Sequence, residues 1–534
     1  MYAWFVVLPP LIVLLCACIT KRVVLSLALG IVGAAFIAGG GNIGGACILL
    51  LQRVGEQLEL ANMFIFIFLV NLGVIITMIS HTGGTAAYSS YMRQKVKNAR
   101  AAQYASLLLS CCFLIDDFFS SITVGCIMRP ITDHFLIPRA KLAFLIDAMA
   151  APLVILVPFS SWIAMITAQL SKAGIALEPG QASTIIADPF IMYVRIIPFI
   201  FYSFLMFASV IFIVWYGISW GPMHTQEVIA ATTGNLFGGK EPLAHRLNQL
   251  TTQEGSLADF IVPMASLILG VLGAGLYAGN YVLLGGGNSL LQALQQTDIF
   301  FALFLGSSIS LVISVLFFTM KNRRFGVQLP ILFYEGYTLM SSSILVLFLA
   351  WTFSGFLIKD LMTGHYIAHL LVGHVGLVWF PALFFIVSVV ISISIGSSWG
   401  TIAVMVPLVV PMVLTFLHIT VPVDPSAVPI LYPLLGAVFA GAVAGDHISP
   451  IASTTVMSST SAGCYHADHV YTQFLYALPA LGASVVAFLL SGLLVHYPMW
   501  LNVCVSLGGG AIICLSLLWL LNYNRELSRQ KANL

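Results

Sequence analysis

Long apolar runs separated by short polar segments are the dominant pattern of this 534-residue chain. Runs of about 20 apolar residues are long enough to cross a bilayer as helices. They predict spans at 2–20, 22–39, 61–80, 142–171, 190–216, 258–278, 298–320, 337–358, 428–458, 474–496 and 500–521. Two further segments, 102–130 and 378–420, are apolar but contain polar residues near their middle, so each is either a long crossing or a hairpin that enters and returns.

The positive charges decide between these two alternatives, because lysine and arginine gather in the cytoplasmic loops of membrane proteins. If both segments are re-entrant hairpins, the N-terminus lies outside and the C-terminus lies inside. The cytoplasmic side then holds Lys21, Arg22, Arg93, Lys95, Lys97, Arg100, Arg129, Arg139, Lys141, Lys240, Arg246, Lys321, Arg323, Arg324, Arg525, Arg529 and Lys531. The outside holds Arg53, Lys172 and Lys359. The sequence therefore predicts an all-α polytopic membrane protein with about 11 transmembrane helices and two re-entrant hairpins.

The composition agrees with this class and excludes others. Hydrophobic residues make up 60% of the chain and charged residues 7%, whereas about a quarter of a soluble domain is charged. A net charge of +2 argues against a nucleic-acid partner. The nine cysteines form no C-x-x-C and no His/Cys pair at zinc spacing, so they predict neither disulfides nor a metal centre. Residues 1–20 lack a basic leader and a small-residue cleavage site, which predicts a retained first span.

An internal repeat emerges when the chain is shifted by 281 residues. The pairs that coincide are Gly55 with Gly336, Thr82 with Thr363, Gly83 with Gly364, Pro130 with Pro411, Pro152 with Pro433, and Pro198 with Pro479. The polar middle of one candidate hairpin thereby falls on the polar middle of the other. An odd number of crossings separates the copies, which predicts inverted repeats with discontinuous helices, as in secondary transporters.

We therefore expect a single transporter domain over residues 1–534. Its first repeat covers about 22–216 and its second about 298–496, with discontinuous helices in both. A connecting cytoplasmic loop at 217–257 is too short for an independent domain. An extra helix follows the second repeat at 500–521.

The candidate chemistry begins at Asp116 and Asp117, two adjacent carboxylates inside the first hairpin. An ionised Asp at the centre of a bilayer costs roughly 2.5–3.5 kcal/mol, so such residues usually line a polar path or site. Ser120, Ser121 and Thr123 add neutral oxygens, and this mixture of oxygens suits a hard cation. Two adjacent carboxylates cannot both ionise cheaply, so a proton and a cation compete there.

Polar residues in the other interrupted segments complete the candidate site. Gly-Asp-His and Ser-Pro inside the apolar span 428–458 predict an unwound helix with free carbonyl groups. For ion or proton coupling we predict Asp116, Asp117, Asp446 and His447. For substrate or ion binding we predict Ser120, Ser121, Thr123, Asp147, Ser160, Ser161, Ser397, Ser398, Thr401, Ser449, Ser453 and Thr454, with Asp117, Ser397, Ser398 and Asp446 as candidate Na+ ligands. His466, Asp468 and His469 fall at a predicted cytoplasmic turn, where a solvated or capping role is expected.

Two blocks, at roughly 100–170 and 395–480, resemble the NhaC-type sodium/proton antiporter family. The residues that carry the resemblance are Asp116-Asp117, Arg129-Pro130, Pro138-Arg139, Ala151-Pro152, Gly445-Asp446-His447, Ser449-Pro450, Thr454-Thr455 and Asp468-His469. The resemblance implies a dimeric ion transporter with a moving transport domain and a fixed scaffold. The family pattern has Asn at the position of Ser120, Asp at the position of Ser453 and an acid at the position of Tyr465.

Two functional hypotheses follow. The first is an antiporter of the inner membrane that exchanges protons for a cation, with no cofactor besides the transported Na+ and H+. The alternative is a Na+- or H+-coupled carrier of a small organic anion or amino acid. The expected partners are the lipid bilayer, the transported ion or solute and, by resemblance, a second copy of the chain. An enzyme is disfavoured because no H-E-x-x-H motif is present.

Overall fold

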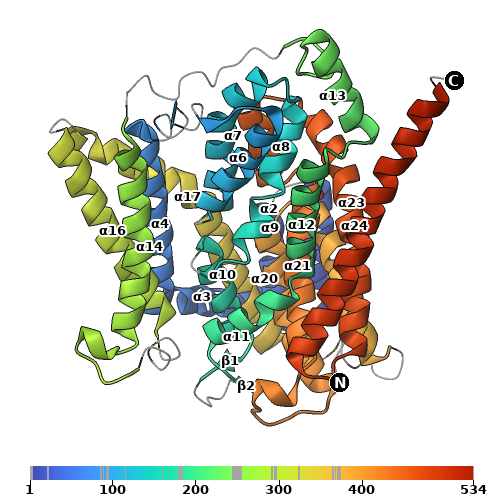
Figure 1. Cartoon of the computed structure of the whole chain (residues 1–534). Helices are drawn as coiled ribbons and strands as arrows, with labels where there is room; N and C mark the ends of the chain where they lie inside the picture. Colours follow the sequence, from blue (N-terminus) through green and yellow to red (C-terminus); the bar gives the residue numbers. More distant parts are fainter. Residues whose placement is uncertain are drawn as a thin grey trace.

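The computed structural model is an almost entirely helical bundle (Figure 1). It describes residues 4–532 except for 21–22, 85–86, 88–89, 92–94, 115, 159, 178–183, 243–254, 290–292, 294–296, 323–324, 364–365, 367–368 and 370–374. Within these ranges, nine helices are long and apolar enough to cross a membrane, or ten when the bent pair within 325–360 counts as one span. The structure therefore has the predicted fold class, a polytopic helical membrane protein.

The first half of the chain consists mainly of helices interrupted at short breaks. Its elements are α1 (Leu8–Thr20), α2 (Val23–Ala38), α3 (Ile43–Gly55), α4 (Leu60–His81), α6 (Ala99–Cys112), α7 (Asp117–His134), α8 (Arg139–Asp147), α9 (Ala151–Val154), α10 (Ser161–Lys172), α11 (Pro189–Ile196), α12 (Phe201–Tyr216) and α13 (Gly221–Thr233). Two short strands, β1 (Ile175–Ala176) and β2 (Ile185–Ile186), pair in parallel between α10 and α11.

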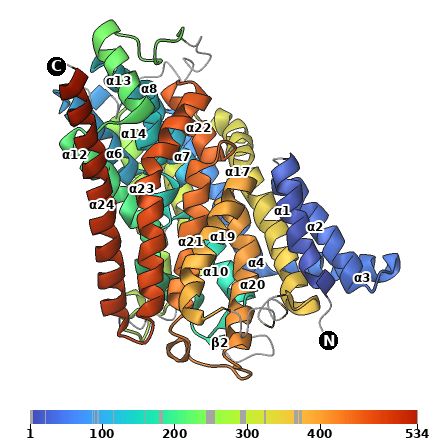
Figure 2. The same ribbon diagram turned by 90° about the vertical axis from the view of Figure 1, so that its right-hand side faces the viewer.

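The second half contains the longer helices. Its elements are α14 (Leu257–Ala278), α16 (Ile299–Lys321), α17 (Phe325–Gly355), the π-helix η5 (Phe356–Asp360), α19 (Phe380–Ile395), α20 (Ser398–Phe416), α21 (Leu431–Ile448), α22 (Ser453–Ala462), α23 (His466–Leu493) and α24 (Met499–Ala532). Figure 2 shows α1, α2 and α3 at one end of the bundle and α24 at the other.

Four interruptions divide apolar segments into half-helices. They lie between α6 and α7, α8 and α10, α19 and α20, and α21 and α22. Gly396 ends α19 with a left-handed φ of +67°, which glycine adopts at little cost. Helices α6 and α19 begin 281 residues apart, and so do α7 and α20. These equal offsets support the predicted repeat, whose boundaries and inverted orientation remain a proposal.

Several boundaries differ from the sequence expectations. Helix α3 was not predicted, because Gln52, Arg53 and Glu56 interrupt its apolar character. Helix α17 begins at Phe325, twelve residues before the predicted span, so Glu335 lies inside it and pairs with His81 at 2.7 Å. The predicted span 142–171 consists of three short helices, and the connecting loop contains α13. Residues 243–254 of that loop lie outside the described ranges.

Small residues let the interrupted helices pack closely. Helices α19 and α21 form the most extensive helix–helix contact in the described chain. A Cβ added at Gly445 of α21 would lie 2.5 Å from the carbonyl oxygen of Val389 and 2.5 Å from the Cβ of Ser392. Gly441 faces the backbone of Phe385 in the same way. Backbones this close are typical of membrane helix interfaces built on small residues.

The three basic residues predicted to lie outside, Arg53, Lys172 and Lys359, belong to one network of polar contacts. Arg53 donates to both carboxylate oxygens of Asp360 at 2.8 Å and to Glu56 at 2.6 Å. Lys359 also donates to Glu56, at 3.1 Å. Burial acts to raise the pKa of Glu56, but the hydrogen bonds from Arg53 and Lys359 bring it below its ordinary value. Lys172 contacts Gln57 and lies 4.4 Å from the ring centroid of Trp351. The network therefore ties α3 to η5 and, through Lys172, to α10.

The first prediction concerns topology. Cysteines introduced singly into a Cys-free background at Lys97 and at Leu136, which flank the α6–α7 pair, should label from the cytoplasmic side. Cysteines at Leu177 and Leu283 should label only from outside, because the charge distribution gives these segments opposite sides. All four positions are exposed, so reagent access is expected. Labelling of 97 and 136 from opposite faces would show that α6–α7 crosses the membrane once.

The second prediction concerns the external network. Replacement Arg53→Gln leaves Asp360 and Glu56 without their shared, largely buried cation, so stability should fall by about 1–3 kcal/mol. Thermal aggregation of the detergent-solubilised protein should begin several degrees lower. Lys359→Gln is the matched control, since Lys359 is half exposed and such pairs contribute about 1 kcal/mol or less. Equal transition temperatures for Arg53→Gln and the wild type would mean that the network does not stabilise the fold.

The third prediction concerns close packing at the second broken span. A Gly445→Ala substitution forces α21 away from the carbonyl of Val389, and we expect a destabilisation of about 1–3 kcal/mol. Gly482→Ala on α23 is the control, because nothing lies within 4 Å of an added Cβ there. Thermal stability in detergent measures both. A Gly445→Ala protein as stable as the control would contradict the packing described.

Candidate functional site

Four half-helices begin at the interruptions of the apolar segments. Helix α7 begins at Asp117, α10 at Ser161, α20 at Ser398 and α22 at Ser453. The first N–H groups of a helix have no partner within it and carry a partial positive charge. Side-chain contacts connect the first turns of α7, α10 and α20 with one another. Another contact connects the first turn of α22 with the end of α21.

The first pair of carboxyl groups lies against the start of α10. The Ser161 hydroxyl donates to Oδ2 of Asp116 at 3.0 Å. The indole N–H of Trp162 donates to Oδ1 of Asp117 at 3.1 Å. Both aspartates are 2% exposed, so these contacts are made away from solvent. The adjacent residues Ser161 and Trp162 therefore hold the two adjacent carboxyl groups.

The third carboxyl group belongs to Asp446 at the end of α21. The Thr454 hydroxyl donates to its Oδ2 at 3.3 Å, and Ser398 is a further hydrogen-bond partner. Asp117 and Asp446 lie close enough to interact electrostatically. The rings of Trp162 and Trp399 meet edge to face, with centroids 6.3 Å apart, and join the starts of α10 and α20. We call Asp116, Asp117, Ser161, Trp162, Ser398, Asp446 and Thr454 the broken-helix site.

The carboxyl groups of Asp117 and Asp446 are not balanced by a basic side chain among the described residues. Among the described residues, neither Asp117 nor Asp446 forms an ion pair with lysine or arginine. The hydroxyls of Ser120 and Ser121, three and four residues beyond Asp117, are buried without a hydrogen-bond partner. Carboxylate and hydroxyl oxygens are ligands for Na+-like hard cations, and a carboxylate can equally take a proton. The arrangement can therefore hold either a cation or protons.

The hydroxyl groups of several other predicted serines and threonines form hydrogen bonds with the backbone. Ser160 bonds to the carbonyls of Val154 and Val157, Ser397 caps α20 by accepting from Gly400 N–H, Thr401 bonds to Ser397, and Ser449 bonds to Ile393. Ser398 bonds to the carbonyl of Ala442 as well. These hydrogen bonds hold the residues in place at the breaks, and each hydroxyl oxygen keeps lone-pair capacity. Thr123 is buried in α7.

Ser453 begins α22 and is exposed, on the face that it shares with Val456 and Thr460, whereas its neighbour Thr454 is buried. Residues three and seven positions apart share a face of a helix, whereas adjacent residues do not. The binding role expected for Ser453 stays a prediction.

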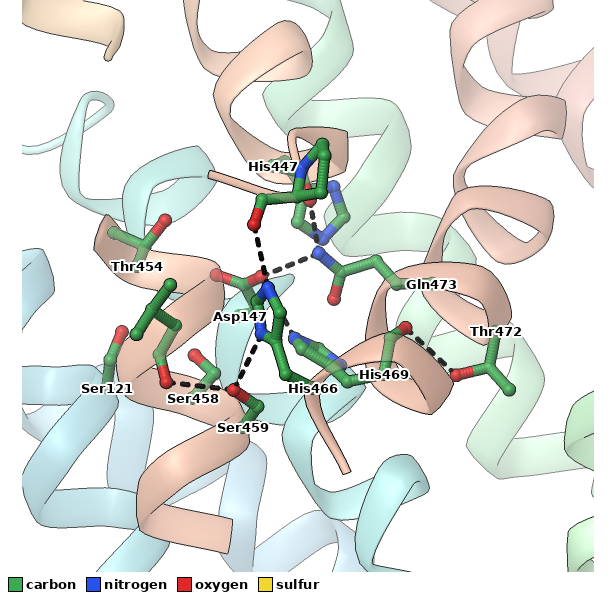
Figure 3. Close-up of polar contacts among 12 residues, drawn as sticks. Ser121, Asp147, His447, Thr454, Ser458, Ser459, His466, His469, Thr472 and Gln473 are labelled. Carbon is green, nitrogen blue, oxygen red and sulfur yellow. Dashed lines mark hydrogen bonds and ion pairs between the residues drawn. The ribbon is translucent and has the colours of Figure 1, made fainter. Parts of the chain in front are cut away.

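Asp147 and His447 belong to a second buried cluster (Figure 3). Asp147 Oδ2 is 3.3 Å from Nε2 of His469 and accepts from the Gln473 amide at 2.6 Å. The Gln473 amide also donates to the carbonyl of His447, whose Nδ1 lies 2.6 Å from the hydroxyl of Tyr202. We call Asp147, Tyr202, His447, His469 and Gln473 the His469 cluster.

The expected solvated or capping role of His469 is therefore wrong. It lies in the first turn of α23, but its ring is fully buried against Asp147, because that turn packs on α8 and α22. Sequence reasoning also missed Tyr202 and Gln473, which carry no local signal in their apolar helices. Trp162 and Trp399 were not among the predicted site residues either, although the motif Ser-Ser-Trp occurs in two interrupted segments, at 160–162 and 397–399.

Comparisons with known proteins agree with a transporter. A sequence model of the Na+/H+ antiporter family matches residues 153–493. An uncharacterized protein of Haemophilus influenzae is 31% identical over 506 residues, which is 92% of each chain. The crystal structure of the Alcanivorax borkumensis YdaH transporter matches with a TM-score of 0.51 and 13% sequence identity, over 86% of this chain and 90% of that one. At this identity the structural match concerns the fold alone.

Broken helices within a multi-pass membrane bundle, together with these matches, point to a membrane transporter rather than an enzyme. The chain belongs to the Na+/H+ antiporter family. The resemblance found in its sequence motifs is thereby confirmed.

Proposed function

We propose that this protein is a secondary active transporter that exchanges Na+ for protons at Asp116, Asp117 and Asp446. The observation that carries the proposal is that Asp117 and Asp446 have no basic partner among the described residues. Ionised carboxylates buried without a basic partner are costly, so they must take up protons or a cation. Both occupants neutralise the same oxygens, so binding of one disfavours the other, as exchange requires.

The residues around the carboxyl groups suit Na+ in exchange with protons. Asp117 and Asp446 supply negative oxygens, and Ser397 and Ser398 are the predicted neutral ligands beside them. The hydroxyls of Ser120 and Ser121 are buried without partners and add oxygen capacity in the same helix as Asp117. Asp116 precedes Asp117 directly, and a charge on one of two neighbouring carboxyl groups disfavours a charge on the other. His447 is directed toward Tyr202 rather than toward Asp446, so we assign it no Na+ contact.

The proposed setting is the inner membrane, with the N-terminus outside and the C-terminus in the cytoplasm. The support is the distribution of lysine and arginine between the two sides. The inverted repeats and the re-entrant course of α6–α7 and α19–α20 belong to the same proposal, supported by the equal offsets of their helix starts. A homodimer is proposed from the family resemblance.

A second candidate function is a coupled carrier of a small organic anion or amino acid. One observation favours it: the indole N–H of Trp399 is buried beside the start of α20 and has no acceptor. A carboxylate of a solute could accept from this donor and from the half-helix N-termini. The wild-type protein in proteoliposomes should be offered labelled amino and dicarboxylic acids under Na+ and proton gradients. Uptake of such a solute, without Na+-driven proton movement, would favour this function over exchange.

The fourth prediction tests the exchange function. Asp117→Asn and Asp446→Asn should each reduce Na+-driven pH change in proteoliposomes at least about tenfold, because an amide keeps the volume but cannot exchange a proton. Asp116→Asn should cost less if only Asp117 faces the transported ion. The measurement is the quenching of a pH-sensitive dye after a Na+ gradient is imposed on equal amounts of folded protein.

The control is Asp424→Asn, which removes an exposed carboxyl group outside the site while keeping an oxygen for its cap on Ser426. This variant should exchange at the wild-type rate. Wild-type rates in Asp117→Asn and Asp446→Asn would exclude the broken-helix site as the place of coupling.

A further inference from the structure

The His469 cluster is buried, polar and separate from the contacts of the broken-helix site. Asp147 on α8 is 1% exposed, and His469 and Gln473 on α23 are fully buried. Figure 3 shows the side chains of Asp147, His469 and Gln473 converging near His447. Among the described residues, no lysine or arginine pairs with Asp147, and His469 is its one recorded ion-pair partner. An ionised Asp147 beside a neutral His469 would leave an uncompensated charge in the interior, which is unfavourable.

The hydrogen-bond inventory of the cluster shows what it lacks. The Gln473 amide donates both hydrogens, to Asp147 and to the carbonyl of His447, and both partners act as acceptors when Asp147 is ionised. This fixes the orientation of the amide, so Oε1 of Gln473 must be the atom without a donor. Oδ1 of Asp147, Nδ1 of His469 and Nε2 of His447 are also buried, and no described residue is a hydrogen-bond partner for them.

The missing component of this cluster is a donor. With Asp147 ionised and His469 neutral, Nε2 of His469 carries the hydrogen that faces Asp147, and Nδ1 is a bare acceptor. Three of the atoms without a partner are then acceptors: Oε1 of Gln473, Oδ1 of Asp147 and Nδ1 of His469. At most one of the atoms without a partner, Nε2 of His447, is a donor. Buried polar atoms in native proteins are rarely left in such a state. One added proton supplies the missing donor and cancels the charge of Asp147.

We propose that the His469–Asp147 pair is a proton-binding site distinct from the broken-helix site. The proton resides on Nδ1 of His469, and it leaves as H+ without further chemistry. The titratable groups that interact with the pair are His447 and Asp446 on α21 and Tyr202 on α12. Helices α6, α7 and α22 also pack on α8, and the interactions described for Asp147 include no charged group from them.

The pair is close enough to the broken-helix site to influence it. Asp147 and Asp446 interact electrostatically, and His447 follows Asp446 directly in α21. When the pair loses its proton, a negative charge is added beside Asp446, and repulsion makes ionisation of both groups less favourable. Loading of this site thus modulates the pH at which Asp446 exchanges its proton. This last step rests on the proposed exchange function, whereas protonation of the pair does not.

The fifth prediction measures protonation directly. Protein labelled with ¹⁵N at histidine is titrated from about pH 5 to about pH 9, the range in which histidine charge changes are expected. The His469 signals are identified by their loss in His469→Gln. We expect the wild-type ring to change its protonation state in this range and Asp147→Asn to move its midpoint by more than about half a pH unit. A ring in one charge state throughout would overturn the proposal and indicate a site for water alone.

Transport assays then separate a proton site from a merely structural contact. His469→Gln keeps an N–H donor for Asp147 but cannot titrate, so it should change the midpoint or steepness of the pH profile of Na+-driven exchange. Asp147→Asn removes the charge that repels Asp446, so its profile should move toward lower pH. His466→Gln is the matched control, one turn earlier on α23, where the ring contacts Ser459 and the carbonyl of Pro450.

A proportional loss of rate at every pH in His469→Gln, with an unchanged profile, would mean that the contact is structural and would overturn the proposed influence on exchange. If the wild type exchanges no Na+ for protons at any pH, the proposed function fails. The histidine titration still decides whether the pair binds a proton, so the two failures are distinguishable.

Discussion

The constraint on which the structure depends is the cost of holding carboxylates inside an apolar bundle without basic partners. Asp117 and Asp446 are almost completely buried, and their described hydrogen bonds come from Trp162, Ser398 and Thr454. Neutral donors reduce the cost of the charges but do not cancel them. In the proposed function, a bound proton or a small cation supplies the missing positive charge.

Interrupted helices make such a site possible within a membrane protein. Continuous helices would satisfy their own backbone groups and expose only side chains, whereas a break frees N–H groups and carbonyls next to the carboxylates. Close glycine contacts, as at Gly445 against Val389, keep the breaks in register with neighbouring helices. The interruption that ends α8 also places Asp147 against α23. Breaks in apolar helices thus create both the broken-helix site and the His469 cluster.

The sequence predicted those features that follow from local composition. Apolar length located most helices, and polar residues inside apolar runs located Asp116, Asp117 and Asp446. It could not predict contacts between distant segments, so His469 was assigned to a solvated turn and Tyr202 and Gln473 were not considered. Nor could the sequence show that Ser453 is exposed while Thr454 is buried, because a helix turns neighbouring side chains about 100° apart. Helix α3 was missed because its polar residues serve an ion-pair network that only the fold assembles.

The most direct test of the central claim is whether Na+ binding releases protons from the protein itself. Na+ is added to the detergent-solubilised protein in weakly buffered solution near neutral pH, and a pH indicator counts the protons released. The account predicts saturable release in the wild type and little or none when both Asp117 and Asp446 are replaced by asparagine. Na+ binding without proton release, or equal release from the doubly substituted protein, would contradict the claim that protons and Na+ compete for these carboxylates.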